Sequence, residues 1–540
     1  MRTPQRIRWP LRALAFAGAF GWVGLAALSA RQPDPSAPQA TGVVYHDRDG
    51  DGLRDPDESG LPGVGVSNGR DVVRTDAEGR YRLPLTDDTV IFVIKPAGWM
   101  TPLDEDNAPR FYYVHKPAGS PRLTYPGVAP TGPLPDSVDF PLVRNHEPER
   151  FRVILFGDTQ PDSQQDIHYL AHDIIEELVG VDAAFGISLG DLVNNDLSLL
   201  EPLIETIGVL GLPWHYVLGN HDKNQDSLDD RYSSETFQRF FGPPHYAFDY
   251  GQVHFVVLDD VVWEKPEPDK RRSYHAGLGR KQLEFIRNDL ALVPAEKLIV
   301  LAMHIPLIEV EDRAELFRIL QERPYTLSLS AHYHFQAHMF LDSDDGWNAP
   351  NPHHHLIHAT ACGSWWTGAP DELGIPHTIM RDGAPNGYSF ITFDRNRYDI
   401  VFKAARRPAD YQMNIYAPEE VAQSQTAQCE VLVNVFAGSD RSTVEMRLGD
   451  RGHWITMKRT ERLDPSYAQL QAMESKLESP PWEKLPRRTR DCHHLWHGQL
   501  PADPPIGTHL VRVRTTDMFG HTYTASRVIR ITRDGPESAP

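Results

Sequence analysis

The sequence predicts a chain of three folded parts, in which a central α/β part lies between two parts built mainly from β-strands. From Phe151 onward, short apolar runs that end in polar residues alternate with segments of helical periodicity, as in α/β folds. Before this region, and again beyond Gly346, short β-prone runs are separated by clusters of turn-forming residues. A length of 540 residues agrees with about three domains.

The first 30 residues have the pattern of an export signal. Residues 1–12 contain four arginines and no acidic residue, and the apolar stretch from Ala13 to Ala30 ends in small side chains. This order predicts a signal peptide over residues 1–30 and a periplasmic or secreted protein. The alternative is an uncleaved membrane anchor, because about 18 apolar residues approach the length that spans a bilayer.

The overall composition argues against nucleic acid as a partner. The chain has 54 Lys and Arg against 74 Asp and Glu, which gives a net charge of −20. Binding to nucleic acid requires basic side chains that displace counterions, and the sequence has no basic stripe. Three cysteines do not make a disulfide framework, but Cys429 and Cys492 both fall in the last β region, and we expect them to form one disulfide.

Residues 41–144 are predicted to form a small β-sandwich, because short β-prone runs at 42–45, 64–67, 80–85 and 90–94 are separated by Gly, Pro and Asp clusters. With this pattern the region resembles carboxypeptidase-regulatory-like modules. Near its start, acidic residues follow the spacing of a twelve-residue calcium loop, at Asp47, Asp49, Asp51, Asp55 and Glu58. Carboxylates this close repel one another unless a cation lies among them, so the sequence predicts a structural Ca²⁺. No amphipathic helices flank the loop, so it is not an EF-hand pair. The alternative to a calcium site is a bare acidic turn.

Residues 150–345 place polar side chains directly after successive apolar runs. Each run is predicted to be a strand, and in α/β folds ligands bind at the carboxyl edge of the strands. The polar residues at these ends are Asp158, Gln160, Asp191, Asn220, His221, His304, His332 and His334.

The order and spacing of these residues resemble the signature of calcineurin-like metallophosphoesterases over about residues 151–340. The motifs are Gly-Asp-x-Gln, Gly-Asp, Gly-Asn-His-Asp, a single His before Ile-Pro, and His-x-His. Each motif alone is weak, but five in family order are specific. The resemblance implies a calcineurin-like core, a β-sandwich flanked by helices, and the hydrolysis of phosphoester bonds.

The resemblance also implies two divalent cations bound at the strand ends. A two-metal hydrolase uses cations about 3.5–4 Å apart to activate water and hold the phosphoryl oxygens. Asp191 matches the bridging carboxylate of the family. The remaining ligands would be Asp158, Gln160 and His334 for metal one, and Asn220, His304 and His332 for metal two. This mixture of oxygen and nitrogen donors suits Mn, Fe, Zn or Mg and does not choose among them.

His221 and Asp222 are the catalytic candidates outside the set of ligands. By the family resemblance, His221 faces the scissile phosphate as an electrophile or general acid, and Asp222 holds its ring. Two positions depart from the family pattern. Gln160 stands where the family often has His, so it would be a weaker ligand or only support the site. Ala331 stands where Gly usually precedes the His-x-His motif.

Residues 346–534 are predicted to form a mostly β domain. Residues 360–368 and 382–388 resemble the C-terminal domain that accompanies some bacterial calcineurin-like phosphoesterases. Trp365 and Trp366 would either line the substrate cleft or pack in the core. The run His353–His355 is expected in a surface loop, with the rim of the active site as the alternative. His168, His172 and Glu176 are expected on a solvated helix face.

The leading interpretation is therefore a metal-dependent hydrolase of small-molecule or glycan-linked phosphoesters. The alternative is a non-catalytic periplasmic or cell-surface binding protein whose metal site is structural. A degenerate enzyme would be expected to lose His221 or Asp191, and both are present. The ligands themselves do not separate monoesters, diesters and nucleotide sugars, because the pocket walls make that selection.

Overall fold

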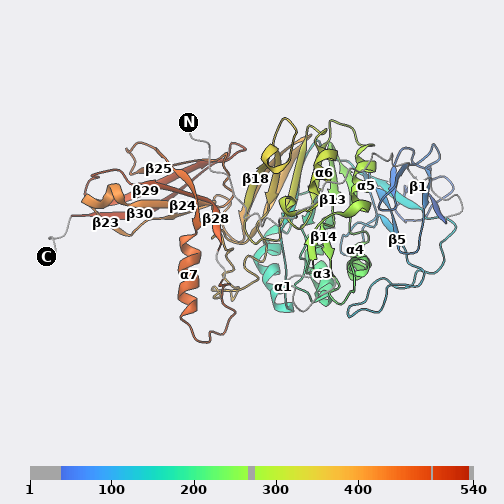
Figure 1. The fold of residues 1–540 in the computed structure, drawn as a ribbon, viewed down its shortest axis with the longest axis horizontal. Helices are drawn as coiled ribbons and strands as arrows, with labels where there is room; N and C mark the ends of the chain where they lie inside the picture. Colours follow the sequence, from blue (N-terminus) through green and yellow to red (C-terminus); the bar gives the residue numbers. More distant parts are fainter. Residues whose placement is uncertain (1–37, 265–273, 488–489, 534–540) are drawn as a thin grey trace, which may run out of the picture. The chain divides into compact units, whose positions relative to one another are not determined.

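The computed structural model describes residues 38–264, 274–487 and 490–533 (Figure 1). The signal peptide predicted over residues 1–30 lies outside the described residues. Among the residues that are described, no helix has both the length and the apolar character needed to cross a membrane.

The N-terminal region contains two four-stranded sheets, and its predicted β character is confirmed. The strands are β1 (Gln39–His46), β2 (Gly65–Ser67), β3 (Val72–Arg74), β4 (Arg80–Pro84), β5 (Thr89–Ile94), β6 (Trp99–Met100), β7 (Tyr112–His115) and β8 (Phe140–Arg144). One sheet has the order β4-β1-β8-β6 and the other β3-β2-β5-β7. Apolar side chains of both sheets, such as Val44 and Ile91, are fully buried.

The core contains two mixed sheets. The five-stranded sheet has the order β11-β10-β9-β20-β21, with β9 (Arg150–Phe156), β10 (Phe185–Ser188), β11 (Trp214–Tyr216), β20 (Gly387–Asp394) and β21 (Arg397–Ala404). The six-stranded sheet has the order β12-β13-β16-β17-β19-β18, with β12 (Tyr246–Tyr250), β13 (Val253–Val257), β16 (Leu298–Ala302), β17 (Thr326–Ser330), β18 (Ala337–Leu341) and β19 (His353–Ile357).

Both core sheets contain a run of neighbouring parallel strands. Strands β9, β10 and β11 are parallel to one another, and so are β13, β16, β17 and β19. Every residue of β10 and β16 is buried, which explains why these strands read as continuous apolar runs without alternation. A short antiparallel pair, β14 (Val261–Trp263) and β15 (Tyr274–Ala276), lies outside the two sheets.

The core helices are α1 (Gln164–Leu170), α2 (Glu176–Leu178), α3 (Leu200–Gly208), α4 (Glu235–Phe241), α5 (Gly279–Leu290) and α6 (Arg313–Leu320). Leu170 of α1 and Leu203 of α3 share one buried cluster with Ile154 of β9, so these helices pack against the five-stranded sheet. His172 pairs with Glu176 at 2.7 Å, and its side chain is 60% exposed, in agreement with the predicted solvated face.

The two core sheets extend beyond residue 345, where the sequence places the end of the catalytic domain. Strand β19 is paired with β17, and β20 is paired with β9 along six residue positions. The paired strands are separated in the sequence, so the local residue pattern does not predict which strands pair. The domain limits themselves stay a prediction.

The C-terminal region consists of two further sheets, and its predicted β character is confirmed (Figure 1). One contains β22 (Met413–Tyr416), β24 (Glu430–Val435), β27 (Lys458–Leu463) and β28 (Asp491–Gln499); the other contains β23 (Glu420–Ala422), β25 (Thr443–Leu448), β26 (Ile455–Thr456), β29 (Gly507–Thr516) and β30 (Thr522–Thr532). Val433 of β24 and Val513 of β29 belong to one hydrophobic cluster, so the two sheets pack face to face. Helix α7 (Pro465–Ser475) begins at Asp464, whose carboxylate accepts two backbone N–H groups.

The predicted disulfide between Cys429 and Cys492 is wrong, because all three cysteines are free. The Cys429 carbonyl accepts the N–H of Leu500, whereas Cys492 is paired with Arg462 near the opposite end of β28. Cys492 and Leu500 are eight residues apart, or about 26 Å at roughly 3.3 Å per residue. Bridged cysteines have Cα atoms within about 7 Å of each other.

The histidine run His353–His355 forms part of β19 in the interior of the six-stranded sheet, so both expected locations are wrong. All three imidazoles are buried, and the neighbouring strand β17 presents hydroxyl groups to two of them, His353 and His355. Thr326 Oγ1 lies 2.8 Å from His353 Nδ1, and Ser328 Oγ lies 2.7 Å from both His353 Nε2 and His355 Nδ1. Hydroxyls two residues apart on a strand lie on the same face of the sheet. The sequence pattern does not show that this face of β17 contacts the histidines of β19.

Burial makes this region sensitive to acid. It lowers the pKa of His353 and His355 to about 3. Between this value and the unfolded pKa of about 6.5, only the unfolded chain takes up these protons. The stabilising contribution is therefore complete above about pH 6.5 and is lost progressively as the pH falls toward the folded-state pKa.

We predict that each of these histidines costs about 1.4 kcal/mol of stability per pH unit below about pH 6.5. The variant His353→Gln should lower the pH slope of the unfolding free energy by about that amount, because glutamine does not titrate. The measurement is urea unfolding between pH 7 and pH 5. The exposed His172→Gln serves as the matched control and should keep the wild-type slope. Identical slopes in all three proteins would contradict the prediction.

Candidate metal centre

The carboxyl ends of five core strands bring the seven predicted ligands to one edge of the two sheets. The chain reaches these residues directly after β9 (Asp158 and Gln160), β10 (Asp191), β11 (Asn220), β16 (His304) and β17 (His332 and His334). His332 is half-buried and the other six side chains are buried. Since β9, β10 and β11 are parallel, and β16 and β17 are parallel, their carboxyl ends meet as the sequence pattern predicts.

Asp191, His304 and His332 form the tightest group. One ligand atom from each lies within 4.8 Å of the other two. His304 Nε2 is 3.2 Å from Asp191 Oδ2, 3.1 Å from Asn220 Oδ1 and 3.1 Å from His332 Nδ1. The other nitrogen of His304, Nδ1, donates to the carbonyl of Leu189 at 2.9 Å, which points Nε2 toward this group.

Asp158 and His334 form a second pair beside the first group. His334 Nε2 lies 3.0 Å from Asp158 Oδ2, and His334 Nδ1 donates to the carbonyl of Gly363 at 2.6 Å. Trp365 stacks on the His334 ring with the centroids 3.9 Å apart. A backbone carbonyl and an indole therefore fix the ring orientation and present Nε2 to the carboxylate.

Two oxygens of this site fit a cation. Among the described residues, no hydrogen-bond donor reaches the buried Gln160 Oε1, and the buried Asp158 Oδ2 has only the His334 ring beside it. A buried acceptor without a partner is costly, and a divalent cation satisfies carboxylate and amide oxygens as a donor would. Gln160 Nε2 lies 3.5 Å from Asp191 Oδ2, so its amide sits between the two groups of ligands.

The pKa values in the site are set by the buried carboxylates of Asp158 and Asp191 and the imidazoles that surround them. Burial alone would raise the pKa of Asp191, but the imidazoles of His304 and His221 hold it well below its usual value. For His304 the effects are reversed, because burial lowers its pKa and the carboxylates of Asp191 and Asp158 raise it to about 10. The buried negative charge thus favours positive charge at this edge.

The backbone turns that carry the ligands leave no room for larger residues. At Gly190, a Cβ atom would lie 2.7 Å from His304 Nδ1, and φ is +88°. At Gly219, a Cβ atom would lie 1.9 Å from the backbone N of Asp191. Four of the ligands themselves have positive φ, which is strained for residues with side chains and is concentrated at functional sites: Gln160, Asp191, His332 and His334.

His221 lies at the open side of these ligands. Its side chain is 29% exposed, and Nε2 is 4.0 Å from Asp191 Oδ2. Its Nδ1 lies 2.7 Å from the Oδ1 of Asn195, which also accepts a hydrogen bond from Gln225. The sequence reasoning missed Asn195, although it follows Asp191 on the same strand-end loop.

The prediction that Asp222 orients the His221 ring is wrong. The Asp222 carboxylate accepts the backbone N–H groups of Gly219 at 2.8 Å and Val193 at 3.1 Å, so it joins two ligand loops. Burial, followed by the charge of Asp191, raises the pKa of Asp222 to about 7. Asn195 instead holds the ring, because its side chain reaches Nδ1 directly.

Asp260 is a second residue that the sequence reasoning missed. Its Oδ1 accepts the N–H groups of His304 and Ile305, each at 3.2 Å, and so fixes the turn that carries the ligand. Burial raises its pKa to about 7. The available signal was its position at the end of the apolar run 255–258.

The region after residue 346 supports the last two ligands. Arg381 donates from Nη2 to the carbonyl of Tyr333 at 2.7 Å, between His332 and His334. Trp366 is buried and donates from its indole N–H to the Thr159 carbonyl at 2.9 Å, whereas Trp365 contacts His334. Of the two predicted alternatives, core packing therefore applies to Trp366, and contact with the site applies to Trp365.

The predicted calcium loop follows β1, and the structure brings only part of it together. Asp47, Asp49 and Glu58 can each offer an oxygen within 4.8 Å of the others, whereas Asp51 and Asp55 are outside this group. The buried Asp47 and Glu58 side chains accept backbone N–H groups of the loop, including those of Gly50 and Arg48 at 2.7 Å each.

Comparison with known proteins identifies three consecutive family models in the chain. Residues 49–124 match the N terminal of calcineurin-like phosphoesterase, residues 151–336 match calcineurin-like phosphoesterase, and residues 355–523 match the C terminal of calcineurin-like phosphoesterase. No curated protein matches the chain. Among solved structures, the chain is similar to a purple acid phosphatase from seeds of yellow lupin (Lupinus luteus), with 15% identity, coverage of 64% of this chain and 67% of that one, and a TM-score of 0.36.

Proposed function

The chain belongs to the calcineurin-like phosphoesterase family, and from this premise we propose that it hydrolyses small-molecule phosphoesters with two divalent cations at the carboxyl edge of its core sheets. The single observation that carries the proposal is the convergence of Asp158, Asp191, His304, His332 and His334 at that edge, with the half-exposed His221 beside them. When bound, the cations would polarise the phosphoryl group and make water a better nucleophile.

Asp191 is the residue best placed to join two cation sites. Its Oδ2 is 3.2 Å from His304 Nε2 and 3.5 Å from Gln160 Nε2, so it lies between the two groups of ligands. Asp158, Gln160 and His334 would complete one site, and Asn220, His304 and His332 the other. Carboxylate, amide and imidazole donors suit Mn, Fe, Zn or Mg.

His221 is the residue best placed to assist the leaving group. Its Nδ1–H donates to the Asn195 amide oxygen, which leaves Nε2 directed toward the ligands. In this position, 4.0 Å from the Asp191 carboxylate, Nε2 would give a proton to the departing oxygen. The non-catalytic alternative gives no role to an exposed imidazole here, so the arrangement favours an enzyme.

The substrate class is the least constrained part of the proposal. The acidic protein, with a net charge of −20, does not favour nucleic acid, and small phosphoesters fit the family. The basic and apolar segment over residues 1–30 supports action in the periplasm or outside the cell. Turnover of phosphomonoesters, phosphodiesters and nucleotide sugars by the Mn-loaded protein tests the function, and the absence of turnover across all three classes would refute it.

We predict that Asp191→Asn removes most of the bound metal and nearly all activity, because a neutral amide does not offset the repulsion between two cations. Elemental analysis of the purified protein gives the metal content per chain. Asp450→Asn, at a side chain that is 73% exposed, is the matched control and should keep both metal and activity. Full metal content in Asp191→Asn would contradict the bridging role.

We predict that His221→Ala keeps its metals and lowers kcat by about 10²–10⁴ for an alkyl phosphate, whose leaving group requires a proton. The loss should be smaller for an aryl phosphate with a good leaving group. The exposed His172→Ala provides the control and should be unaffected. Equal losses for the two substrates would remove the general-acid role.

We also propose that Asp47, Asp49 and Glu58 hold a structural Ca²⁺, since three carboxylates offer oxygens to one point and calcium prefers such donors. We predict that Ca²⁺ raises the stability of the full chain by about 2.7 kcal/mol at a hundredfold excess over Kd. Calorimetric melting with and without Ca²⁺ measures this gain. Asp49→Asn should abolish it, and Asp57→Asn, 79% exposed in the same loop, should not. No calcium effect in the wild type would leave a bare acidic turn.

A further inference from the structure

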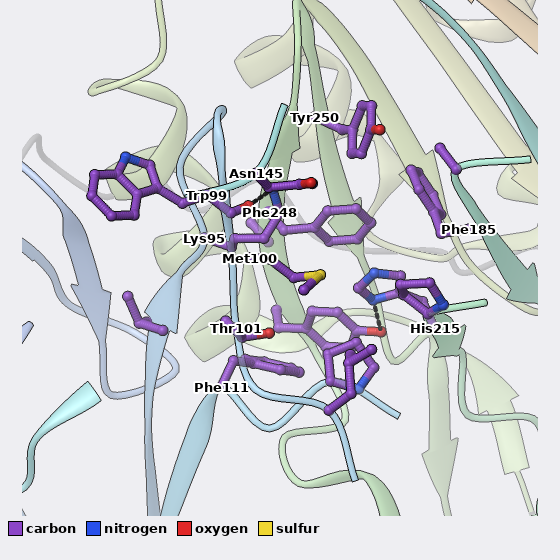
Figure 2. Close-up of a pocket in the computed structure, with 17 residues that line it drawn as sticks. Lys95, Trp99, Met100, Thr101, Phe111, Asn145, Phe185, His215, Phe248 and Tyr250 are labelled. Carbon is purple, nitrogen blue, oxygen red and sulfur yellow. Dashed lines mark hydrogen bonds between the residues drawn. The ribbon is translucent and has the colours of Figure 1, made fainter. Parts of the chain in front are cut away.

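A cavity of about 190 Å³ lies between the N-terminal sheets and the core (Figure 2). The N-terminal region contributes residues from β5, β6 and the following segment, including Met100 and Phe111. The core contributes residues at the amino ends of β10 and β11 and along β12, including Phe185 and His215. The predicted ligands follow the opposite, carboxyl ends of β10 and β11, so this cavity is separate from the candidate metal centre.

Aromatic rings make up much of the cavity wall. Phe248 stacks on His215 with ring centroids 3.9 Å apart and planes 4° from parallel. Phe111 contacts Tyr246 at 4.8 Å, and Phe185 meets Phe248 edge to face at 5.6 Å. In Figure 2 the side chain of Met100 extends toward the labelled rings of Phe248 and His215, and Phe185 lies farther away on the same side. Flat aromatic faces favour a flat aromatic occupant through offset and edge-to-face contacts.

The polar groups of the cavity carry no free charge. Lys95 is bound to Glu147 at 2.7 Å and to the carbonyl of Trp99 at 2.8 Å, so its ammonium is neutralised. The hydroxyl of Tyr246 lies 3.4 Å from His215 Nδ1, and the two groups form one polar spot in a mostly apolar wall that also contains Thr101 and Asn145. Burial lowers the pKa of His215 to about 3, so this ring is neutral at neutral pH. An anion such as phosphate finds no free positive partner here.

We propose that this cavity is a binding site for a small, uncharged aromatic molecule of about the size of phenol or indole. A cavity of about 150 Å³ with apolar walls accommodates benzene, and 190 Å³ leaves space for one substituent or a second small ring. The Tyr246–His215 pair provides a place for one hydroxyl or N–H group of the occupant. Sites of this kind combine apolar walls with a few polar groups that set orientation. The inference does not depend on the proposed hydrolytic function.

Phenol is the probe for a direct test on the full chain. Isothermal titration should show one phenol per chain, and saturating phenol should raise Tm. Toluene should bind as well, because the walls are mainly apolar, whereas inorganic phosphate should not bind at this cavity. An intermolecular NOE between phenol and the methyl group of Met100 should place the ligand. The absence of phenol binding up to millimolar concentration would overturn the proposal.

Two substitutions separate a specific site from general binding. Met100→Trp fills the cavity and should weaken phenol at least about tenfold, and Met473→Trp, at a residue 55% exposed on α7, is the matched control and should bind as the wild type does. His215→Phe removes the polar partner and should weaken phenol relative to toluene. Equal phenol affinity in Met100→Trp and wild type would overturn the site. If Met100→Trp does not fold, the NOE to Met100 in the wild type decides alone.

Discussion

Asp158 and Asp191 are carboxylates buried at the carboxyl edge of the core sheets, and their charge constrains everything placed around them. An ionised carboxylate in an apolar interior is costly unless charged or hydrogen-bonding partners surround it. Imidazoles supply those partners, and the same balance that lowers the pKa of Asp191 raises that of His304 to about 10. The tight turns at Gly190 and Gly219 follow from this need, because only glycine lets the loops approach closely enough.

The same constraint explains why the chain after residue 346 is part of the site. His332 and His334 present their rings only if the short segment between them is held from behind. Arg381 holds the Tyr333 carbonyl, and the buried Asp382 accepts the Gln336 N–H at 2.8 Å. Asp382 is in turn bound at 2.9 Å by His494 of β28, so the C-terminal sheets are linked to the ligand loop through one carboxylate.

The sequence predicts features that depend on neighbouring residues in the chain. It does not predict features that depend on which strands pair with each other. Polar residues after apolar runs predicted the ligand edge, because parallel strands place their carboxyl ends together whatever the details of packing. The buried histidine strand was misplaced, since its hydroxyl partners Thr326 and Ser328 come from another strand. Asn195 and Asp260 were missed for a related reason: each acts by holding a neighbour, and a supporting role leaves no motif. The cysteine pairing failed because the register of β28 cannot be read from composition.

Histidines at the two ends of the core strands have pKa values shifted in opposite directions. His304, at the carboxyl end of β16, is surrounded by carboxylates that raise its pKa to about 10. His215, near the amino end of β11, is stacked on Phe248 and buried beside the Lys95 ammonium, and its pKa falls to about 3. Desolvation disfavours charge on both rings, so the difference comes from the neighbours. The carboxylates at one edge of the fold therefore favour a charged imidazole, whereas burial and the Lys95 ammonium at the other edge keep the His215 ring neutral.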